Sequence, residues 1–441
     1  MPEIGSPVWW VQRLREQLDK RATTVDLLSR YYEGDHPLPQ PINERIRRQF
    51  VRILTASRAN WTGLIVDAVA ERLHVDGFRL DTDIGVSDDT AWEMWQANSL
   101  DAESELVHNE ALVTGESYVS VWADPDDPEM PLITPEHPRQ MVVEVDPENH
   151  RRLAAALKCY RDDWTGDLLA TLYLPDGIWK YREQNGQWQE RAQSLANPLG
   201  EVPVVPFRNR PRLLTGGRSE IGDVLDIQDR INKTLFDRMM AGEYSSYRQR
   251  YSIGMEIPTD DQGRVKAPFE AAVDRLWMAE DPDVKFGEFS QTDLGPFIAA
   301  VESDIQHMAA ISRTPPHYLL GQIINISGDA LKAAESGLAS KAKSRARHFG
   351  EAWEQVIRLA FAVLDDPRAK VMDSQTIWAD PETRTEGERV DALVKMASLG
   401  VPRAALWERW GASQQEIERW RSLQMSEALV NQGVDLTELM P

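Results

Sequence analysis

Apolar residues recur at helical spacing in two neighbouring stretches of the chain, which two prolines separate. In residues 293–313 they return every three or four positions, and this spacing predicts an amphipathic helix. These positions are Phe297, Val301, Ile305, Met308 and Ile311. The helix must end near Arg313, because proline lacks an amide hydrogen and Pro315 moves Thr314 out of the α region.

The second stretch, residues 330–364, predicts a helix far longer than the average. Its apolar positions stay in register throughout and are Leu331, Leu338, Ala342, Ala346, Phe349, Trp353, Val356, Ala360 and Val363. At the rise of an α-helix the stretch spans about 50 Å. Taken alone, the two stretches also fit an ordinary two-helix hairpin in a helical domain.

Residues 314–329, between these helices, predict an unusual loop. From His317 to Gly328 the segment contains no Lys, Arg, Asp or Glu, and a structureless loop of about a dozen residues tends to be functional. Its bulky apolar residues are Tyr318, Leu319, Leu320, Ile323 and Ile324. Either these groups serve a function at the surface, or part of the loop packs beneath a neighbouring domain.

The N-terminal half of the chain changes from helical to strand periodicity near residue 115. Helices are expected at residues 9–20, 24–32, 60–73 and 89–115. Alternating β-forming residues then predict strands at 117–122, 141–145, 153–160, 168–174, 178–182 and 188–191, with turn sequences between them. Together these elements predict an α+β fold with a mostly antiparallel sheet.

Helical spacing returns after the proline-rich, extended segment 197–207. Ser219 is a favourable N-cap, and Glu220 and Asp223 would lie near the positive end of the helix dipole. The apolar side consists of Ile221, Leu225, Ile231, Leu235 and Met239. The other side is expected to face water or a polar channel and includes Asp226, Asp229, Arg230, Lys233 and Asp237.

Two further regions differ in composition. Residues 252–291 contain many prolines, glycines and aspartates, so they predict only short strands and turns. The C-terminal region predicts helices at 385–399, 403–410 and 413–429.

Composition places the chain among globular proteins. It is 42% hydrophobic and 27% charged, and its length of 441 residues predicts two or three domains. The single cysteine, Cys159, excludes an internal disulfide and a cysteine-cluster zinc site, and we expect it to be a small buried residue. Because there is no apolar run of eighteen residues and no signal-peptide pattern, we expect synthesis in the cytoplasm and no membrane association.

The charge balance argues against tight nucleic-acid binding. The chain has 71 acidic and 49 basic residues, a formal charge of −22, whereas proteins that neutralise phosphates usually carry a basic surface. A conduit through which DNA slides is compatible with this charge, because strong phosphate contacts would slow the movement. The acidic surface also fits a role in solubility alone.

Motifs of catalysis are weak in this sequence. Residues 215–219 precede a helix as a phosphate-binding loop would, but they lack the Gly-Lys-Ser/Thr core, and a glycine-permitted turn explains them. The eight histidines show no metal-ligand spacing, and the paired aspartates lie beside turn residues. We therefore expect no enzyme activity, cofactor or metal. Two specific functions nevertheless stay open at this point. One is a helix-rich, metal-dependent nucleic-acid enzyme built from scattered carboxylates, and the other is a minor capsid or scaffold component.

A local basic cluster interrupts the acidic chain on the long second helix. Lys341, Lys343, Arg345 and Arg347 follow one another at steps of two, so they surround the helix instead of forming a stripe. We expect ion pairs with acidic neighbours, including those of an adjacent subunit, rather than DNA contacts.

Several motifs in sequence order resemble one family. They are Tyr31-Tyr-Glu-Gly-Asp-His-Pro-Leu38, then Val66-Asp67, Glu71-Arg-Leu73 and Gly77-Phe78, then Gly217-Arg-Ser-Glu-Ile-Gly-Asp-Val224 with Gln228-Asp-Arg-Ile-Asn232, and finally residues 391–402. With the helix–loop–long helix pattern, they resemble phage portal proteins of the Gp6-like branch found in Bacillus phages and actinobacteriophages. The resemblance covers nearly the whole chain, and the segment beginning at Gly217 is its most specific part.

The resemblance implies a portal fold and its subdivision. It assigns residues 1–215 to a wing, 216–251 to a first stem helix, 252–291 to a clip, 292–313 to a second stem helix, 314–329 to a tunnel loop, 330–364 to a spine helix and 365–441 to a helical, crown-like region. Tyr318, Leu319, Leu320, Gln322, Ile323, Ile324, Asn325 and Ser327 would then face the DNA channel.

The resemblance also implies a function and a set of partners. The chain would form a ring, usually a dodecamer, at a capsid vertex of the virion, through which double-stranded DNA is packaged and ejected. The large terminase subunit would supply the energy. Major capsid and scaffolding proteins and head-completion or adaptor proteins would be the other partners.

Overall fold

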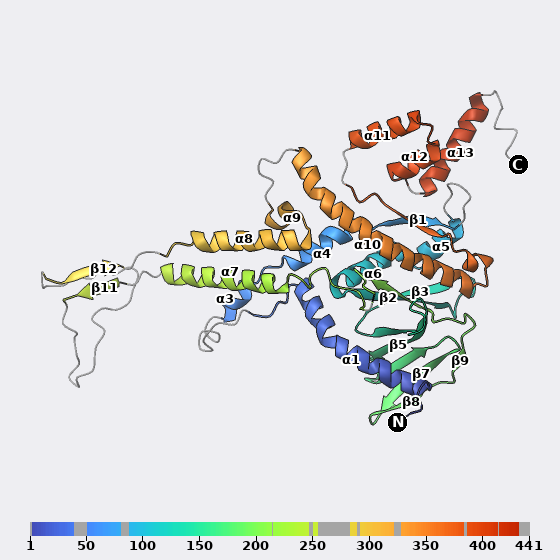
Figure 1. Cartoon of the computed structure of the whole chain (residues 1–441), viewed down its shortest axis with the longest axis horizontal. Coiled ribbons are helices and arrows are strands. Elements are labelled where there is room, and N and C mark those ends of the chain that lie inside the picture. The colour runs from blue at the N-terminus through green and yellow to red at the C-terminus, as the bar shows by residue number, and fades with distance from the viewer. Residues whose placement is uncertain are drawn as a thin grey trace. The chain divides into compact units, whose positions relative to one another are not determined.

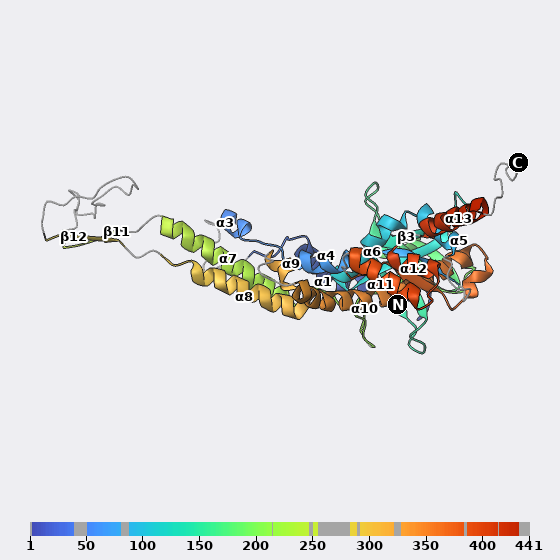
Figure 2. The same cartoon turned by 90° about the horizontal axis from the view of Figure 1, so that it is seen from above.

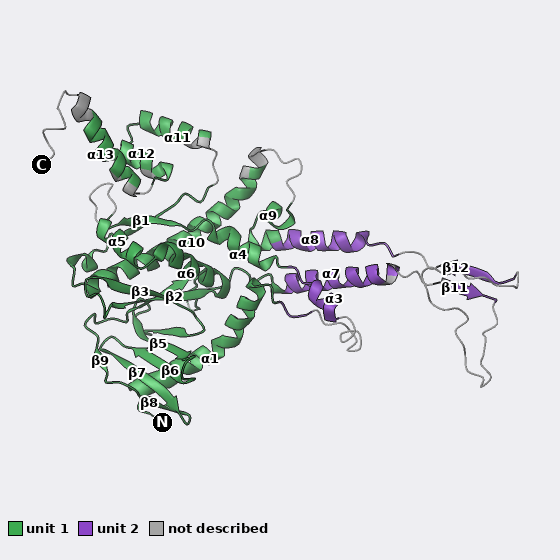
Figure 3. Cartoon of the chain, turned by 180° about the vertical axis from the view of Figure 1, so that it is seen from behind, with its two compact units in different colours: residues 1–35, 60–225, 309–441 green, residues 36–59, 226–308 purple. Residues whose placement is uncertain are grey.

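The chain forms an α+β fold, described by a computed structural model (Figure 1). The structure describes residues 2–38, 51–80, 88–213, 215–246, 250–254, 283–288, 292–321, 328–382, 386–412 and 414–431. It divides into two compact units (Figure 3). Unit 1 comprises residues 1–35, 60–225 and 309–441, and unit 2 comprises residues 36–59 and 226–308.

The N-terminal helix of unit 1, α1 (Pro7–Tyr32), is continuous, so the prediction of two short helices was wrong. Ser6 caps it and Pro7 occupies its first turn, where the missing amide hydrogen has no cost. Around the expected break, Ala22 is buried, and Arg21 donates hydrogen bonds to the Tyr118 hydroxyl (2.8 Å) and Glu116 (3.1 Å). These distant contacts hold the central turn in helical form.

One antiparallel sheet packs against α1. Its strands are β4 (Met141–Val145), β5 (Leu153–Arg161), β6 (Leu168–Tyr173), β7 (Gly177–Gln184), β8 (Gln187–Glu190) and β9 (Leu195–Ala196), which pairs with β7. Val11, Leu14 and Leu18 of the helix form a core with buried sheet residues such as Leu157 and Leu172. The predicted antiparallel meander between residues 141 and 191 is confirmed.

A second antiparallel sheet has the strand order β10 (Val204–Arg208), β2 (Glu116–Ala123), β3 (Pro131–Glu136). The strand β3 was not predicted, because Pro131 and Pro135 obscure its alternation. The helices α4 (Thr62–Ala70), α5 (Asp89–Ala97) and α6 (Leu100–Thr114) complete this part of unit 1.

A break between α5 and α6 replaces the single helix expected at residues 89–115. Ser99 has a left-handed backbone with φ of 54°. Asn98 causes the break, because its side chain donates to the carbonyls of Met94 and Pro131 and accepts from the amide of Ile133 (2.8–2.9 Å). The contacts of Asn98 with the distant strand β3 therefore end α5.

The long helix α10 (Gly328–Val363) confirms the prediction for residues 330–364, and one of its faces forms the centre of unit 1. Trp353 and Phe349 are fully buried and pack with Trp95, Phe207 and His108 from three other elements. After α10, a 3-10 turn (Pro367–Lys370) leads to β13 (Gln375–Trp378), which pairs with β1 (Val75–Arg79). Neither of these two strands was predicted.

Three helices follow, α11 (Glu386–Ser398), α12 (Arg403–Trp410) and α13 (Gln414–Asn431), close to the predicted limits. Within the described ranges, no helix combines the length and the apolar character that a membrane crossing requires.

Unit 2 consists mainly of two helices that run side by side, α7 (Leu225–Ser246) and α8 (Gly295–Ser312), whose end residues belong to unit 1 (Figures 1 and 2). It also contains α3 (Val51–Ala56) and the antiparallel pair β11 (Arg250–Ile253) and β12 (Lys285–Glu288). The prediction for residues 293–313 is confirmed. Most of the predicted short-strand insert, residues 255–282, lies outside the described residues.

The helix α7 begins at Leu225, six residues after the predicted N-cap. The amide of Glu220 donates to the carbonyl of Leu112 in α6 (2.9 Å), so this segment is held against another element before the helix can start. Ser219 instead accepts a hydrogen bond from the amide of Ile221 (3.1 Å) in the preceding turn.

Candidate functional site

The predicted loop after the two prolines begins with a short helix, α9 (Pro316–Leu320). Tyr318, Leu319 and Leu320 therefore lie on a helical turn, and Leu319 is buried. The remaining predicted loop residues, Gln322, Ile323, Ile324, Asn325 and Ser327, lie outside the described residues.

Three side chains from other elements of unit 1 hold α9. The indole of Trp61 donates to the carbonyl of Leu319 (2.9 Å), and the guanidinium of Arg72 donates to the hydroxyl of Tyr318 (2.7 Å). Arg72 also pairs with Glu335 of α10 (3.4 Å), and the same carboxylate is 3.5 Å from the His317 ring. The backbone that enters the uncharged segment is thus fixed to residues that flank α4 and to α10.

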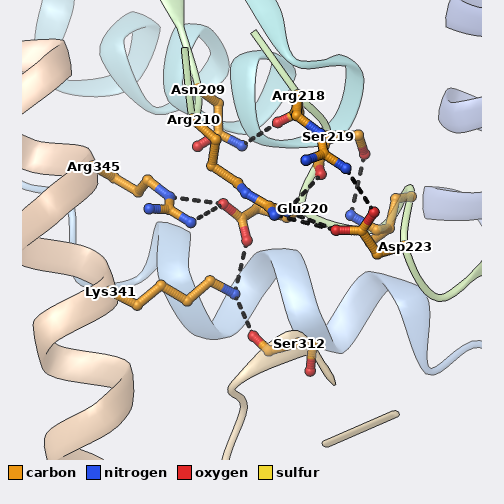
Figure 4. A network of polar contacts seen from close by, with 10 residues as sticks. Asn209, Arg210, Arg218, Ser219, Glu220, Asp223, Ser312, Lys341 and Arg345 are labelled. Carbon is orange, nitrogen blue, oxygen red and sulfur yellow. Dashed lines mark hydrogen bonds and ion pairs between the residues drawn. The ribbon is translucent and has the colours of Figure 1, made fainter. Parts of the chain in front are cut away.

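A buried carboxylate, Glu220, joins α10 to the segment that precedes α7 (Figure 4). Lys341 (2.9 Å) and Arg345 (2.7 Å) both pair with it, and Lys341 also donates to the Ser312 carbonyl at the end of α8 (2.9 Å). The side chains of Glu220 and Lys341 are 2% and 4% exposed, so solvent contributes little to this cluster.

Charge compensation keeps this carboxyl group ionised. Burial alone would raise the pKa of Glu220, but the two neighbouring cations outweigh burial and hold its pKa below the usual value. An uncompensated buried charge costs several kcal/mol, roughly 3–5 when one partner is removed. The cluster therefore fixes the relative positions of the end of α8, of α10 and of the turn before α7.

Two members of the predicted basic cluster have an ion-pair partner within the chain. Lys341 and Arg345, one helical turn apart, pair with an acidic residue of the same chain. Lys343 pairs with Glu382 at the surface, and Arg347 is exposed. The four similar residues of the sequence thus have different surroundings.

A second carboxylate of this region, Asp223, is shared by two arginines. Arg210 (3.2 Å) and Arg218 (2.9 Å) both pair with it, and the side chain is 40% exposed. The Asn209 side chain donates to the Arg218 carbonyl (2.7 Å) and so holds the turn that carries these groups (Figure 4).

The two glycines in residues 215–219 allow a close approach to neighbouring segments of the chain. A Cβ on Gly217 would lie 1.8 Å from the carbonyl oxygen of Gly115, so only glycine fits. The Gly217 amide donates to the Glu116 carboxylate (2.9 Å), which takes the position that a phosphate would have in a phosphate-binding loop. The interpretation as a turn is therefore the one that the contacts support.

The predicted polar side of α7 lies in unit 2. Arg230 pairs with Asp304 of α8 (2.6 Å), and Lys233 pairs with Asp237 (2.5 Å). Asp226 is exposed and Asp229 is half-buried. Ion pairs within and between the two helices thus account for Arg230, Lys233 and Asp237.

His36, part of the Tyr-Tyr-Glu-Gly-Asp-His-Pro motif, belongs to a buried polar network. It is fully buried in unit 2, and its Nδ1 atom is 2.9 Å from the side-chain nitrogen Nδ2 of Asn232 in α7. Asn232 in turn accepts from the amide of Ala59 (3.1 Å), and Gln228 donates to the Ala59 carbonyl (2.7 Å). This polar network joins His36 and Ala59 to α7.

Trp61, Arg72, Glu335 and Glu220 are site residues that sequence reasoning missed, because their partners lie more than 100 positions away in the chain. In the described part of the chain, no group of three or more His, Cys, Asp or Glu is arranged to hold a metal ion.

Comparison with known proteins covers almost the entire chain. The family described as "Phage portal protein, SPP1 Gp6-like" matches residues 11–427. The portal protein of Mycobacterium phage D29 is 33% identical over 421 residues, which are 92% of this chain and 86% of that protein. The portal protein of Mycobacterium phage L5 is 30% identical over 452 aligned positions, covering 98% of this chain and 92% of that protein.

Proposed function

Because this chain belongs to the SPP1 Gp6-like family of phage portal proteins, we propose that its long helices and the loop between them form the wall and the constriction of a DNA channel. A portal protein is a structural, non-enzymatic component of the virion that provides the passage for DNA at a capsid vertex and connects head and tail. The family implies an oligomeric ring.

The proposed division of labour follows the chain. Residues 1–215 form the wing, α7 and α8 the stem, residues 252–291 the clip, α10 the spine and residues 365–441 the crown-like region. Asp226, Asp229, Arg230, Lys233 and Asp237 line the stem part of the channel or the contact between stems. Lys343 and Arg347, which are exposed, face neighbouring subunits.

The firm attachment of α9 is the observation that supports a constriction at residues 314–329. Hydrogen bonds from Trp61 and Arg72 fix the start of this segment, while the residues that follow carry no charge. A loop with a fixed base can hold its tip at a defined distance from the ring axis. Its uncharged groups would touch DNA weakly and allow the duplex to slide.

We propose the partners that the family resemblance implies. The ring is a dodecamer, the clip binds the large terminase subunit during packaging and head-completion or adaptor proteins afterwards, and the wing contacts the major capsid and scaffolding proteins. The motor supplies the energy.

Deletion of Gln322–Ser327 tests the constriction. We expect rings to assemble normally, because α8, α9 and α10 supply packing on both sides, whereas phage built from the variant should package or retain less DNA. A second variant that replaces the six residues by a Gly-Ser segment of equal length separates loop length from loop chemistry. Negative-stain images and the DNA content of particles are the measurements.

Two results would contradict the proposal. Loss of rings in both variants would make the segment a structural connector. Normal packaging and retention in both variants would show that the DNA does not depend on this loop.

A further inference from the structure

Unit 1 contains a polar cavity of about 430 Å³ at the buried Glu220 cluster. Its charged lining residues are Arg210, Glu220, Asp223, Arg313, Lys341 and Arg345. The four cations exceed the two carboxylates, in a chain whose formal charge is −22. The cavity is therefore a positively charged recess in an acidic protein.

The contacts in this cavity leave one cation unused. Both carboxylates are already shared, Glu220 by Lys341 and Arg345, and Asp223 by Arg210 and Arg218. By contrast, the Arg313 guanidinium has no hydrogen-bond or ion-pair partner among the residues that the structure describes, and Arg313 is exposed. It can offer its planar fork of donors to an anion from outside.

The backbone conformation at Arg313 is one that favours glycine. Arg313 follows the last residue of α8 with φ of 54°, and the Thr314 amide donates to the Ala309 carbonyl (3.0 Å), which is a helix ending that usually places glycine at this position. A residue with a Cβ is strained there. The Arg313 side chain thus lines the cavity although its backbone conformation is strained.

The shape of the recess favours a protein carboxylate over DNA. Duplex phosphates form a continuous convex row that an exposed basic stripe neutralises, whereas this cavity is a recess that a single side chain can enter. A closed ring brings a different surface of the next subunit against each subunit. In a chain with 71 acidic residues, that surface readily supplies a carboxylate.

We propose that this cavity receives an acidic side chain of the neighbouring copy of the chain, with Arg313 as its principal donor. The contact rests on ring formation and is independent of the assignment of the channel loop. It gives the ring an attachment point directly beside the Glu220 cluster, where α8 ends against α10.

Matched charge-removing variants of the full chain test this contact. Arg313→Gln should raise the protein concentration needed for half-maximal ring assembly at least tenfold at low salt, measured by sedimentation velocity. Arg313→Lys should recover part of the loss. Arg151→Gln, which removes an exposed arginine in the turn between β4 and β5, should stay within twofold of the parent protein.

A photoreactive residue in place of Ile311, which lines the same cavity and leaves Arg313 intact, identifies the partner. In rings assembled from mixed ¹⁴N and ¹⁵N subunits, we expect isotopically mixed cross-links to a segment that contains Asp or Glu. Cross-links confined to one copy, or to added DNA, would overturn the inference, and so would assembly of Arg313→Gln equal to that of Arg151→Gln. A parent chain that forms no rings would instead contradict the proposed function itself.

Discussion

Lys341, Lys343, Arg345 and Arg347 are indistinguishable by sequence spacing, but their surroundings give them different roles. Two of them lie beside the buried Glu220, one pairs at the surface and one is exposed. These surroundings differ because only one face of α10 packs into unit 1. At the scale of single residues, burial and charge partners therefore decide the role of a side chain more than its type does.

His108 is a second residue whose role depends on burial. It is fully buried, its Nε2 atom accepts a hydrogen bond from the Trp353 indole (2.8 Å), and it stacks on Phe349. Burial lowers its pKa from 6.5 to about 3, so the folded protein keeps the ring neutral.

This pKa shift predicts a dependence of stability on pH. Between pH 6.5 and about 3 the unfolded chain binds one more proton at His108 than the folded chain does, so stability falls as the pH falls through this range. From pH 6.5 to 5 the loss is about 2 kcal/mol. His108→Gln should lower the thermal midpoint at pH 7.5 and show a smaller further decrease at pH 5 than the parent. An unchanged pH profile in the variant would assign the acid sensitivity to other groups.

At the scale of elements, α9 depends on contacts with α4 and α10 more than on its own five residues. Isolated helices of this length are unstable in water. The hydrogen bonds from Trp61 and Arg72, together with the burial of Leu319, supply the missing stability.

Loss of the Arg72 contact should therefore loosen α9 locally. Arg72→Met keeps most of the apolar stem of the side chain but removes the hydrogen bond to Tyr318 and the ion pair with Glu335, which costs about 1–3 kcal/mol. We expect faster amide hydrogen exchange in residues 317–321 and unchanged exchange in the buried middle of α10. Arg13→Met, which removes a more exposed ion pair with Glu144, is the control. Equal exchange of residues 317–321 in both variants would show that packing alone holds α9.

At the scale of the whole molecule, charge governs how the protein meets DNA. A portal protein provides a passage for DNA, and strong phosphate binding would oppose sliding. The formal charge of −22 gives the protein an overall negative field that opposes such binding.

Purified rings should accordingly bind duplex DNA weakly and without sequence preference. We expect dissociation constants above about 1 μM at physiological salt, weakening further as salt rises, because the attraction that remains is electrostatic. Fluorescence anisotropy with two unrelated duplexes over a salt series measures both properties, and intact duplexes after incubation exclude hydrolysis. Nanomolar binding to one of the sequences only would show a specific site that this account does not include.

The sequence by itself determined the elements whose signals are local. Regular apolar spacing and the prolines at 315 and 316 fixed α8 and α10, and alternating residues between turn sequences fixed the strands from β4 to β8. Motifs distributed along the chain indicated the family, which the comparison over residues 11–427 confirms. These signals survive because each depends on neighbouring residues only.

The tertiary structure alone decided the features that depend on distant partners. Arg21 keeps α1 continuous through Tyr118, Asn98 ends α5 through β3, and Glu220 delays α7 through its contact with Leu112. The same holds for the candidate site, where Glu220 meets Lys341 more than 100 positions later in the chain. Local spacing carries no information about such pairs, because only packing brings their atoms together and removes the water that would otherwise compete for them.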